Sequence, residues 1–421
     1  MADYDDPDTE KGSETMPCED QDAAFILGKG GSTKQKIARV SEAELELDEK
    51  ANVLTIYGTH RQRKKARDYV QFIIQQRQGN VQIDLDSGRD DMTVMRVPCE
   101  CVAFVMGRGG ATLRMMENEW GTLMFFAKGF GDGLADEKSS EVLMIFGPLA
   151  KRRGAEMKVM SAVEHKINGT FIKDGQLVMQ ERVFGDEPPD DWEVETIPLE
   201  NDEFSYALGS GGATRKKLAA ASGCILEYIG RLACMMGYRV DRRRAKDYLK
   251  WLLKQRQPGG LKIDPETRDD VTVVPVPSNS VGFITGSRGE ALRNVEKESS
   301  TFCFINNSRS ENGAGASGAA NGEELLIFAY DDRARERAKM LILDRLEEHR
   351  TGRPKALSGG YSSSGCFAGC FFGCSSGSFR GLFRGLVLRG GFLAAFGLLH
   401  SLAESCPGAT VCEARREELL P

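Results

Sequence analysis

Phe25-Ile-Leu-Gly-Lys-Gly-Gly31 is the first of four stretches in which a short apolar run ends in Gly-x-x-Gly. The other three are Phe104-Val-Met-Gly-Arg-Gly-Gly110, Tyr206-Ala-Leu-Gly-Ser-Gly-Gly212 and Phe283-Ile-Thr-Gly-Ser-Arg-Gly289. Each is followed by a segment with helical spacing, two extended runs and a charged amphipathic helix. Because glycine has no Cβ, such a loop can bring backbone N–H groups and a neighbouring cation close to a phosphate. We therefore expect the four loops to grip a nucleic-acid backbone.

A larger repeat contains these four stretches. The segment RKKARDYVQFIIQQRQ at 63–78 matches RRRAKDYLKWLLKQRQ at 242–257, about 179 residues later. The following segments also match at the same offset, since Arg89-Asp-Asp-Met-Thr-Val94 corresponds to Arg268-Asp-Asp-Val-Thr-Val273. A two-domain unit has therefore been duplicated.

With these loops and the elements expected around them, the chain resembles the KH family of RNA-binding domains in its type I arrangement. The resemblance covers about residues 15–350 and implies an α+β fold of four tandem domains. Each domain would be ordered β-α-α-β-β-α, with a three-stranded antiparallel sheet against three helices. In overall plan the chain is similar to poly(C)-binding and vigilin-like proteins.

The pattern divides the chain into seven segments. We expect a disordered acidic tail at 1–14, KH 1 at 15–78, KH 2 at 90–167, a hairpin and acidic linker at 168–191, KH 3 at 192–257, KH 4 at 270–350 and a low-complexity Gly/Ser/Cys/Phe tail at 351–421. The last tail contains Arg-Gly pairs, which leaves two interpretations open: loose RNA affinity or no fold and no role.

The resemblance implies which residues bind RNA. In KH domains the loop clamps the backbone of about four unpaired nucleotides while their bases lie along an apolar groove. The RNA-binding residues are expected to be Gly28, Lys29, Gly30, Gly31, Lys34, Gly107, Arg108, Gly109, Gly110, Arg114, Gly209, Ser210, Gly211, Gly212, Arg215, Lys216, Gly286, Ser287, Arg288, Gly289 and Arg293. The groove would be lined by Ile26, Leu27, Ile37 and Leu45 in the first copy and by Val105, Leu113 and Met124 in the second.

The four copies are not equivalent. Leu113 and Leu292 occupy a helix position where the first and third copies carry Lys34 and Arg215, so Ile37 and Leu218 are expected to make the core contact there. Lys36 and Lys217 are each expected on a solvated helix face. The third loop contains no charged residue, and we therefore expect the first two copies to bind best and the third worst.

Composition restricts the other classes of function. The net charge of −6 argues against a general polycationic binder, and eleven irregularly spaced cysteines favour free thiols in a reducing cytoplasmic or nuclear compartment. The acidic N-terminus lacks the features of a signal peptide, and the apolar run at 382–402 is interrupted by Arg384 and Arg389.

No enzyme motif is found in the sequence. The Gly-rich loops lack the Lys-Ser/Thr ending of a P-loop, and Thr33 and Thr112 stand where a dinucleotide fingerprint needs glycine. The four histidines are scattered, and no metal or cofactor motif is seen. We therefore expect a protein without catalytic activity.

The sequence thus predicts binding of single-stranded RNA and a role in post-transcriptional control of mRNA, through stability, translation or splicing. Single-stranded DNA is one alternative, because a phosphate clamp does not read the 2′-hydroxyl. A protein-interaction scaffold is another, since an exposed Trp251 would favour homo-oligomers or pairing of domains within the chain. Base preference is not written in these motifs.

Overall fold

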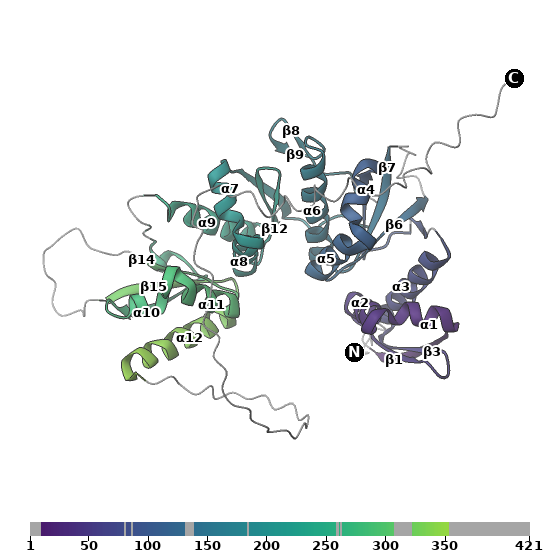
Figure 1. Cartoon of the computed structure of the whole chain (residues 1–421), viewed down its shortest axis with the longest axis horizontal. Helices are drawn as coiled ribbons and strands as arrows, with labels where there is room; N and C mark the ends of the chain where they lie inside the picture. Colours follow the sequence, from purple (N-terminus) through teal and green to yellow (C-terminus); the bar gives the residue numbers. More distant parts are fainter. Residues whose placement is uncertain are drawn as a thin grey trace, which may run out of the picture. The chain divides into compact units, whose positions relative to one another are not determined.

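The computed structural model describes residues 10–79, 81–85, 87–130, 139–182, 185–257, 261, 263–306 and 322–352. This part of the chain forms four successive repeats with the same order of elements (Figure 1). Predictions for residues 1–9 and 353–421 lie outside the described residues. Within the described ranges, no helix has both the length and the apolar character needed to cross a membrane.

Repeat 1 shows the fold of all four. Its elements are β1 (Lys11–Pro17), α1 (Asp20–Leu27), α2 (Ser32–Ser41), β2 (Glu44–Asp48), β3 (Val53–Thr59) and α3 (His60–Gln78). The strands form an antiparallel sheet in the order β1-β3-β2. The predicted tail at 1–14 is too long, because residues 11–14 belong to β1 and pair with β3, Lys11 lying opposite Thr59.

The other three repeats have the same topology. Repeat 2 contains β5 (Met92–Pro98), α4 (Cys99–Met106), α5 (Ala111–Trp120), β6 (Leu123–Phe130), β7 (Ser140–Phe146) and α6 (Leu149–Lys166). Repeat 3 contains β10 (Trp192–Pro198), α7 (Asn201–Leu208), α8 (Ala213–Ser222), β11 (Ile225–Ile229), β12 (Leu232–Tyr238) and α9 (Arg239–Lys254). Repeat 4 contains β13 (Val271–Pro277), α10 (Val281–Thr285), α11 (Glu290–Ser299), β14 (Phe302–Asn306), β15 (Gly322–Phe328) and α12 (Asp332–Thr351).

The sheet orders confirm the α+β class and the three-stranded antiparallel sheets. They are β5-β7-β6, β10-β12-β11 and β13-β15-β14, and β4 (Gln82–Asp84) adds to β6 in parallel. In each repeat one arginine near the start of the third helix donates to the carbonyl at the end of the preceding strand. These arginines are Arg63, Arg152, Arg242 and Arg335.

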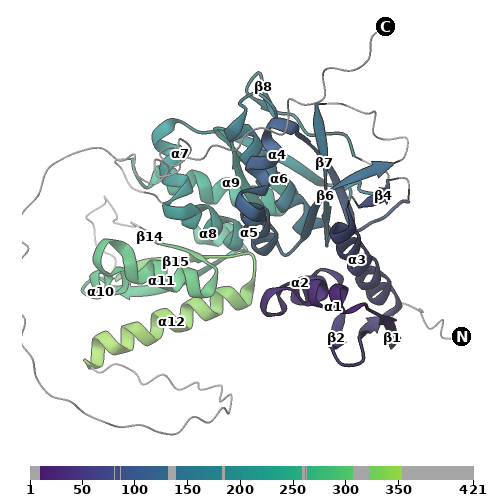
Figure 2. The same cartoon turned by 45° about the vertical axis from the view of Figure 1, so that its right-hand side comes forward.

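In repeats 1 to 3 the third helix packs on the sheet of the next repeat. Phe72 of α3 lies 5.4 Å from Phe146 of β7, ring centre to ring centre, and Trp251 of α9 lies 4.9 Å from Phe328 of β15. Between them, α6 packs on β11, and the Ser161 hydroxyl donates to the Tyr228 carbonyl at 2.6 Å. Figure 2 shows α3 between the repeat 1 strands and β6. The central strands of repeats 2 to 4 are therefore buried on both faces.

The matched Arg-Asp-Asp segments hold these contacts in each half. Arg89 pairs with Asp91, which accepts a hydrogen bond of 2.8 Å from the Tyr69 hydroxyl of α3. Arg268 and Asp270 repeat the arrangement with Tyr248 of α9, at 2.7 Å. Opposite charges are thereby paired beside the apolar contact, so that burial leaves no isolated ion.

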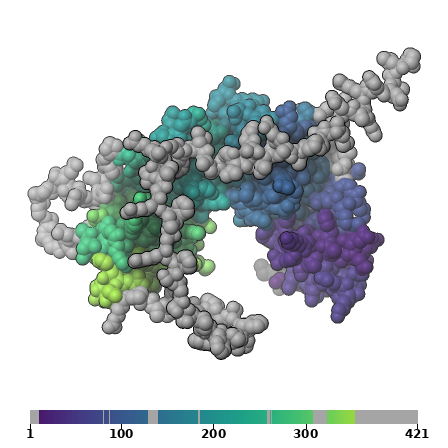
Figure 3. All heavy atoms as spheres, viewed as in Figure 1, coloured from purple at the N-terminus to yellow at the C-terminus, as the bar shows by residue number. Residues whose placement is uncertain are grey.

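The sheet of repeat 1 differs because its outer face is polar. Glu44 and Tyr57 are exposed there, whereas the equivalent Ile225 and Met236 of repeat 3 are buried under α6. A polar outer face is typical of the terminal unit of a repeat array. Repeat 1, purple in Figure 3, therefore has the surface of such a cap.

The segment at 168–191 is held against repeat 2. Its predicted hairpin is present as β8 (Ile172–Lys173) and β9 (Gln176–Leu177), with an Asp-Gly turn. Part of the predicted acidic linker is packed on α6, since Asp186 is buried between Arg152 and Arg153, at 3.1 and 3.0 Å. Two buried guanidinium groups need a counter-charge, and this part of the segment supplies it.

Candidate nucleic-acid interface

The four Gly-x-x-Gly loops have one backbone geometry. The first glycine of each has a φ between 67° and 70°, and its carbonyl accepts the N–H of the last glycine at 3.1–3.2 Å. A Cβ on Gly28 or Gly107 would lie 2.2 or 2.1 Å from the hydroxyl oxygen of Thr33 or Thr112. Positive φ and this close approach together make glycine necessary at the first position.

Two loop cations are exposed and unengaged. Lys29 and Arg108 both protrude into solvent, and neither side chain has a hydrogen bond or ion pair within the described part of the chain. In the fourth loop Arg288 adopts a φ of 52° where the other copies have glycine. Each of these side chains can therefore reach an anion without breaking an existing contact.

The arginine after each even-numbered loop has a local partner. Arg114 donates to the Gly109 carbonyl at 2.6 Å, and Arg293 donates to the Arg288 carbonyl at 2.7 Å. Both side chains remain exposed. They stabilise the loop and place a second positive charge beside it. Lys34 is half-buried, with no side-chain partner among the described residues.

Arg215 was predicted to bind RNA, but the structure places its side chain in a contact between repeats. Its side chain is 3% exposed and pairs with Glu227 at 2.7 Å and with Glu119 of repeat 2 at 2.6 Å. Burial raises the pKa of the Glu227 carboxyl, and the charge of Arg215 opposes that shift. Arg215 is therefore part of the contact between repeats 2 and 3. Its neighbour Lys216 stays exposed, 3.5 Å from Glu119.

Lys36 and Lys217 were expected on solvated helix faces, and this was wrong. Lys36 pairs with Glu117 at 2.6 Å and Lys217 pairs with Glu296 at 2.9 Å, in equivalent places of the two halves. Both carboxylates are buried, and each also accepts a backbone N–H of its own repeat. Burial raises their pKa values while the paired lysines lower them.

These ion pairs join the second helices of all four repeats in sequence. The first joins α2 to α5, the contact of Arg215 with Glu119 joins α5 to α8, and the last joins α8 to α11. Each of these helices begins at the end of a Gly-x-x-Gly loop. The positions of neighbouring loops are thus coupled by direct side-chain contacts. These contacts were not predicted from the sequence, although the matched glutamates at 117 and 296 are a visible signal of them.

The predicted groove residues belong to the core. Ile26, Ile37, Leu45, Val105, Leu113 and Met124 are all buried. Leu27 is half-buried and is the one member of that set at the surface. Leu45 and Met124 lie on β2 and β6 and the other four lie on helices, and all six pack in a hydrophobic core, which leaves little of their surface for a base.

An exposed aromatic ring lies beside each loop instead. Phe25, Phe104, Tyr206 and Phe283 all stand three residues before the first glycine and are 39–42% exposed. Arg256 lies over the Tyr206 ring at 5.1 Å, and Arg345 lies over the Phe283 ring at 5.1 Å. The sequence signal was the aromatic position shared by the four stretches.

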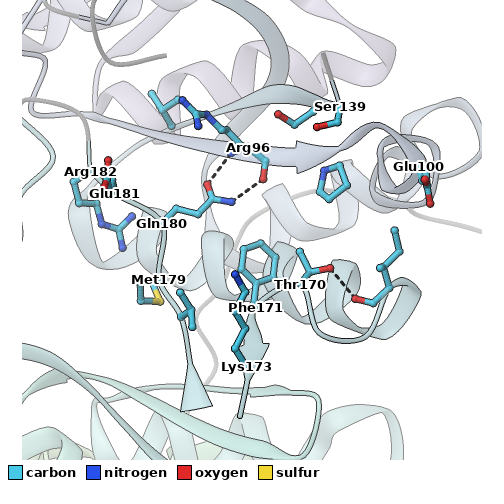
Figure 4. Close-up of a pocket in the computed structure, with 15 residues that line it drawn as sticks. Arg96, Glu100, Ser139, Thr170, Phe171, Lys173, Met179, Gln180, Glu181 and Arg182 are labelled. Carbon is cyan, nitrogen blue, oxygen red and sulfur yellow. Dashed lines mark hydrogen bonds between the residues drawn. The ribbon is translucent and has the colours of Figure 1, made fainter. Parts of the chain in front are cut away.

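A pocket of about 770 Å³ lies away from the loops (Figure 4). It is formed between β5 and the segment at 167–182, where the Gln180 side chain bonds both the N–H and the carbonyl of Arg96 at 2.8 Å. Acidic and basic side chains are mixed around it. None of the predicted RNA-binding residues lines it, and no cluster suited to a metal ion is found in the described residues.

Comparison with known proteins identifies one repeat. Residues 13–72 match the family model of the KH domain. Among solved structures, the chain is similar to Dim2p from Pyrococcus horikoshii OT3, with 14% identity, 59% of this chain and 94% of that chain covered, and a TM-score of 0.16. A structure of the a/eIF2alpha–aDim2p–rRNA complex from the same organism is also similar. It has 15% identity, with 59% of this chain and 89% of that chain covered and a TM-score of 0.16.

A third structure, described as "KH domains", has 13% identity, with 80% of this chain and 83% of that chain covered and a TM-score of 0.13. No curated protein matches the chain. The family match, together with the loop geometry of the same segment, supports nucleic-acid binding in general and the placing of repeat 1 in the KH-domain family.

Proposed function

We propose that the chain binds single-stranded RNA through four tandem KH domains of the type I arrangement. The observation that carries the proposal is the pair of exposed, unengaged cations, Lys29 and Arg108, in loops of one geometry. Repeats 2 to 4 have the strand order and loop shape of the repeat that matches the family model, which supports extending the assignment to them.

The role proposed for this binding is post-transcriptional control of mRNA in the cytoplasm or nucleus, without catalysis. Each loop holds the backbone of about four nucleotides. Linking several such sites in one chain raises the overall affinity through effective concentration. The side-chain contacts between successive second helices support a concerted action of the sites, because they restrict how far neighbouring loops can move apart.

The loop assignment is tested by charge reversal. In the Lys29→Glu/Arg108→Glu variant both changes fall on exposed residues, so that folding is retained and phosphate is repelled. We expect fluorescence anisotropy to show at least about tenfold weaker binding to a single-stranded RNA pool, about 1.4 kcal/mol. The control is Lys250→Glu/Lys254→Glu, which makes the same charge change on exposed positions of α9.

Three results would overturn parts of the proposal. If the loop variant and the control bind RNA equally well, the loops do not hold the RNA backbone. If the chain binds the matching DNA or duplex pools more tightly than single-stranded RNA, then that nucleic acid, and not single-stranded RNA, is the ligand. Crosslinking in cells, followed by sequencing of the bound RNA, tests the mRNA role, and recovery of mostly ribosomal RNA would contradict it.

A further inference from the structure

We propose that the cleft between α8 and α11 binds a backbone phosphate of the strand, as an anion site separate from the loops. This inference rests on the proposed function, because its ligand is a phosphodiester of the bound single strand. The cleft has a volume of about 410 Å³. It lies between repeats 3 and 4, and its walls are the helices that follow their Gly-x-x-Gly loops.

The charge in the cleft is strongly positive. Lys216, Lys217, Arg293 and Lys297 line it, against one carboxylate, that of Glu296. This carboxylate is already neutralised by Lys217 at 2.9 Å and accepts the Cys303 N–H at 2.9 Å. Two lysines and an arginine are therefore left with no acid in the cleft to balance them.

The available cations are accessible. Lys297 is exposed and has no side-chain partner among the residues that the structure describes. Lys216 is also exposed, and its one acidic neighbour, Glu119, is 3.5 Å away and already bonded to Arg215 at 2.6 Å. These lysines can therefore turn towards a phosphate in the cleft without breaking a strong hydrogen bond or ion pair.

The position of the cleft connects two loops. Ala213 and Thr214 line it and begin α8 directly after the third loop. Arg293 lines it from the other side and donates to the carbonyl of Arg288 in the fourth loop. The third loop has Ser210 where the first two have a cation, so that the cleft supplies positive charge to the loop that lacks it.

The first half of the chain lacks two of these positive charges. Gln35 and Asn118 occupy the positions equivalent to Lys216 and Lys297 in the duplicated unit. The helices α2 and α5 are joined by the same lysine–glutamate pair as α8 and α11. The halves thus share this lysine–glutamate contact and differ in two exposed side chains, which are lysines only in the cleft of the second half.

This difference supplies the test. The Lys216→Gln/Lys297→Asn variant of the full chain introduces the first-half residues into the second half. We expect about tenfold weaker binding to a single strand of about twelve nucleotides and a clearly smaller loss for a strand of about four nucleotides, because the first and second loops can hold the short strand without the cleft. The dependence of log K on log salt should become shallower by about 0.7 for each phosphate that the variant no longer binds.

The Lys250→Gln/Lys254→Asn variant makes the same charge change outside the cleft and should bind both strands like the wild type. If the cleft variant and this control bind the long strand alike, with equal salt slopes, the cleft inference is overturned and the proposed function stands. A wild-type chain that binds no single strand would instead overturn the proposed function, and the inference with it. Circular dichroism of both variants establishes that they fold.

Discussion

At the scale of single residues, neighbours from another repeat decide what a side chain does. Lys34 and Arg215 hold the same position of the repeat, yet Lys34 is half-buried without a side-chain partner among the described residues and Arg215 is enclosed by Glu119 and Glu227. A guanidinium that is paired with two carboxylates stabilises the contact between repeats and is not available to a phosphate. Position in the repeat was therefore a poor guide to which side chains stay accessible.

A glycine in α6 gives a prediction at this scale. A Cβ on Gly154 would lie 2.1 Å from the ring of Trp120, so that Gly154→Ala forces the indole or the helix to move. We expect a loss of about 1–3 kcal/mol in the free energy of unfolding, as for other overpacked cores. The control Gly282→Ala lies in a helix with open space around it and should be neutral or stabilising. Urea denaturation measures both, and equal stability would contradict the packing.

At the scale of elements, one lysine–glutamate pair joins neighbouring second helices in each half. Removing Lys217 alone leaves the buried Glu296 carboxylate without its cation. We expect Lys217→Met to lower the unfolding free energy by about 1–3 kcal/mol and the double variant Lys217→Met/Glu296→Gln to recover most of it. Lys339→Met, in an exposed pair with Glu336, should cost no more than about 0.5 kcal/mol. Additive effects in the cycle would argue against the pairing.

The same carboxyls predict a dependence on pH. Burial raises the pKa values of Glu117 and Glu296 above the ordinary value of 4.5, so that between 4.5 and the raised value the folded chain binds more protons than the unfolded one. Their contribution to stability is therefore greatest at low pH and falls as pH rises through this window. Glu117→Gln/Glu296→Gln should flatten that fall in urea midpoints measured against pH. An unchanged profile would exclude these groups as its source.

At the scale of the whole described array, α3, α6 and α9 each pack on two sheets, that of their own repeat and that of the next. Removing repeat 1 would uncover Phe125, Met144 and Phe146, which are buried against it. Each such side chain contributes about 1.5–3 kcal/mol when fully buried. We expect a fragment of residues 81–352 to melt earlier than residues 10–352 and to bind a hydrophobic dye. A fragment that melts at the same temperature would contradict the shared helix.

The sequence predicted the architecture well because the repeat carries its own pattern. Loop glycines, apolar spacing and the matched segment after 63 each follow from local geometry, and the four loops and their flanking helices lie where the pattern placed them. The contacts between repeats could not be predicted in this way. Whether Lys36 meets solvent or Glu117 depends on which surfaces face each other, and the spacing within one repeat contains no such information. The exposed or buried state of Trp251 was open for the same reason.

The helices that pack on two sheets are also synthesised before the second of those sheets. A ribosome releases α3 before β5, β6 and β7, α6 before β11 and β12, and α9 before β14 and β15. The surface that will cover a new sheet has therefore already been made when that sheet emerges, and nascent strands need not wait for a later part of the chain. Synthesis from the N-terminus lets early domains fold first, so that each covering helix can be in place before the sheet it packs on.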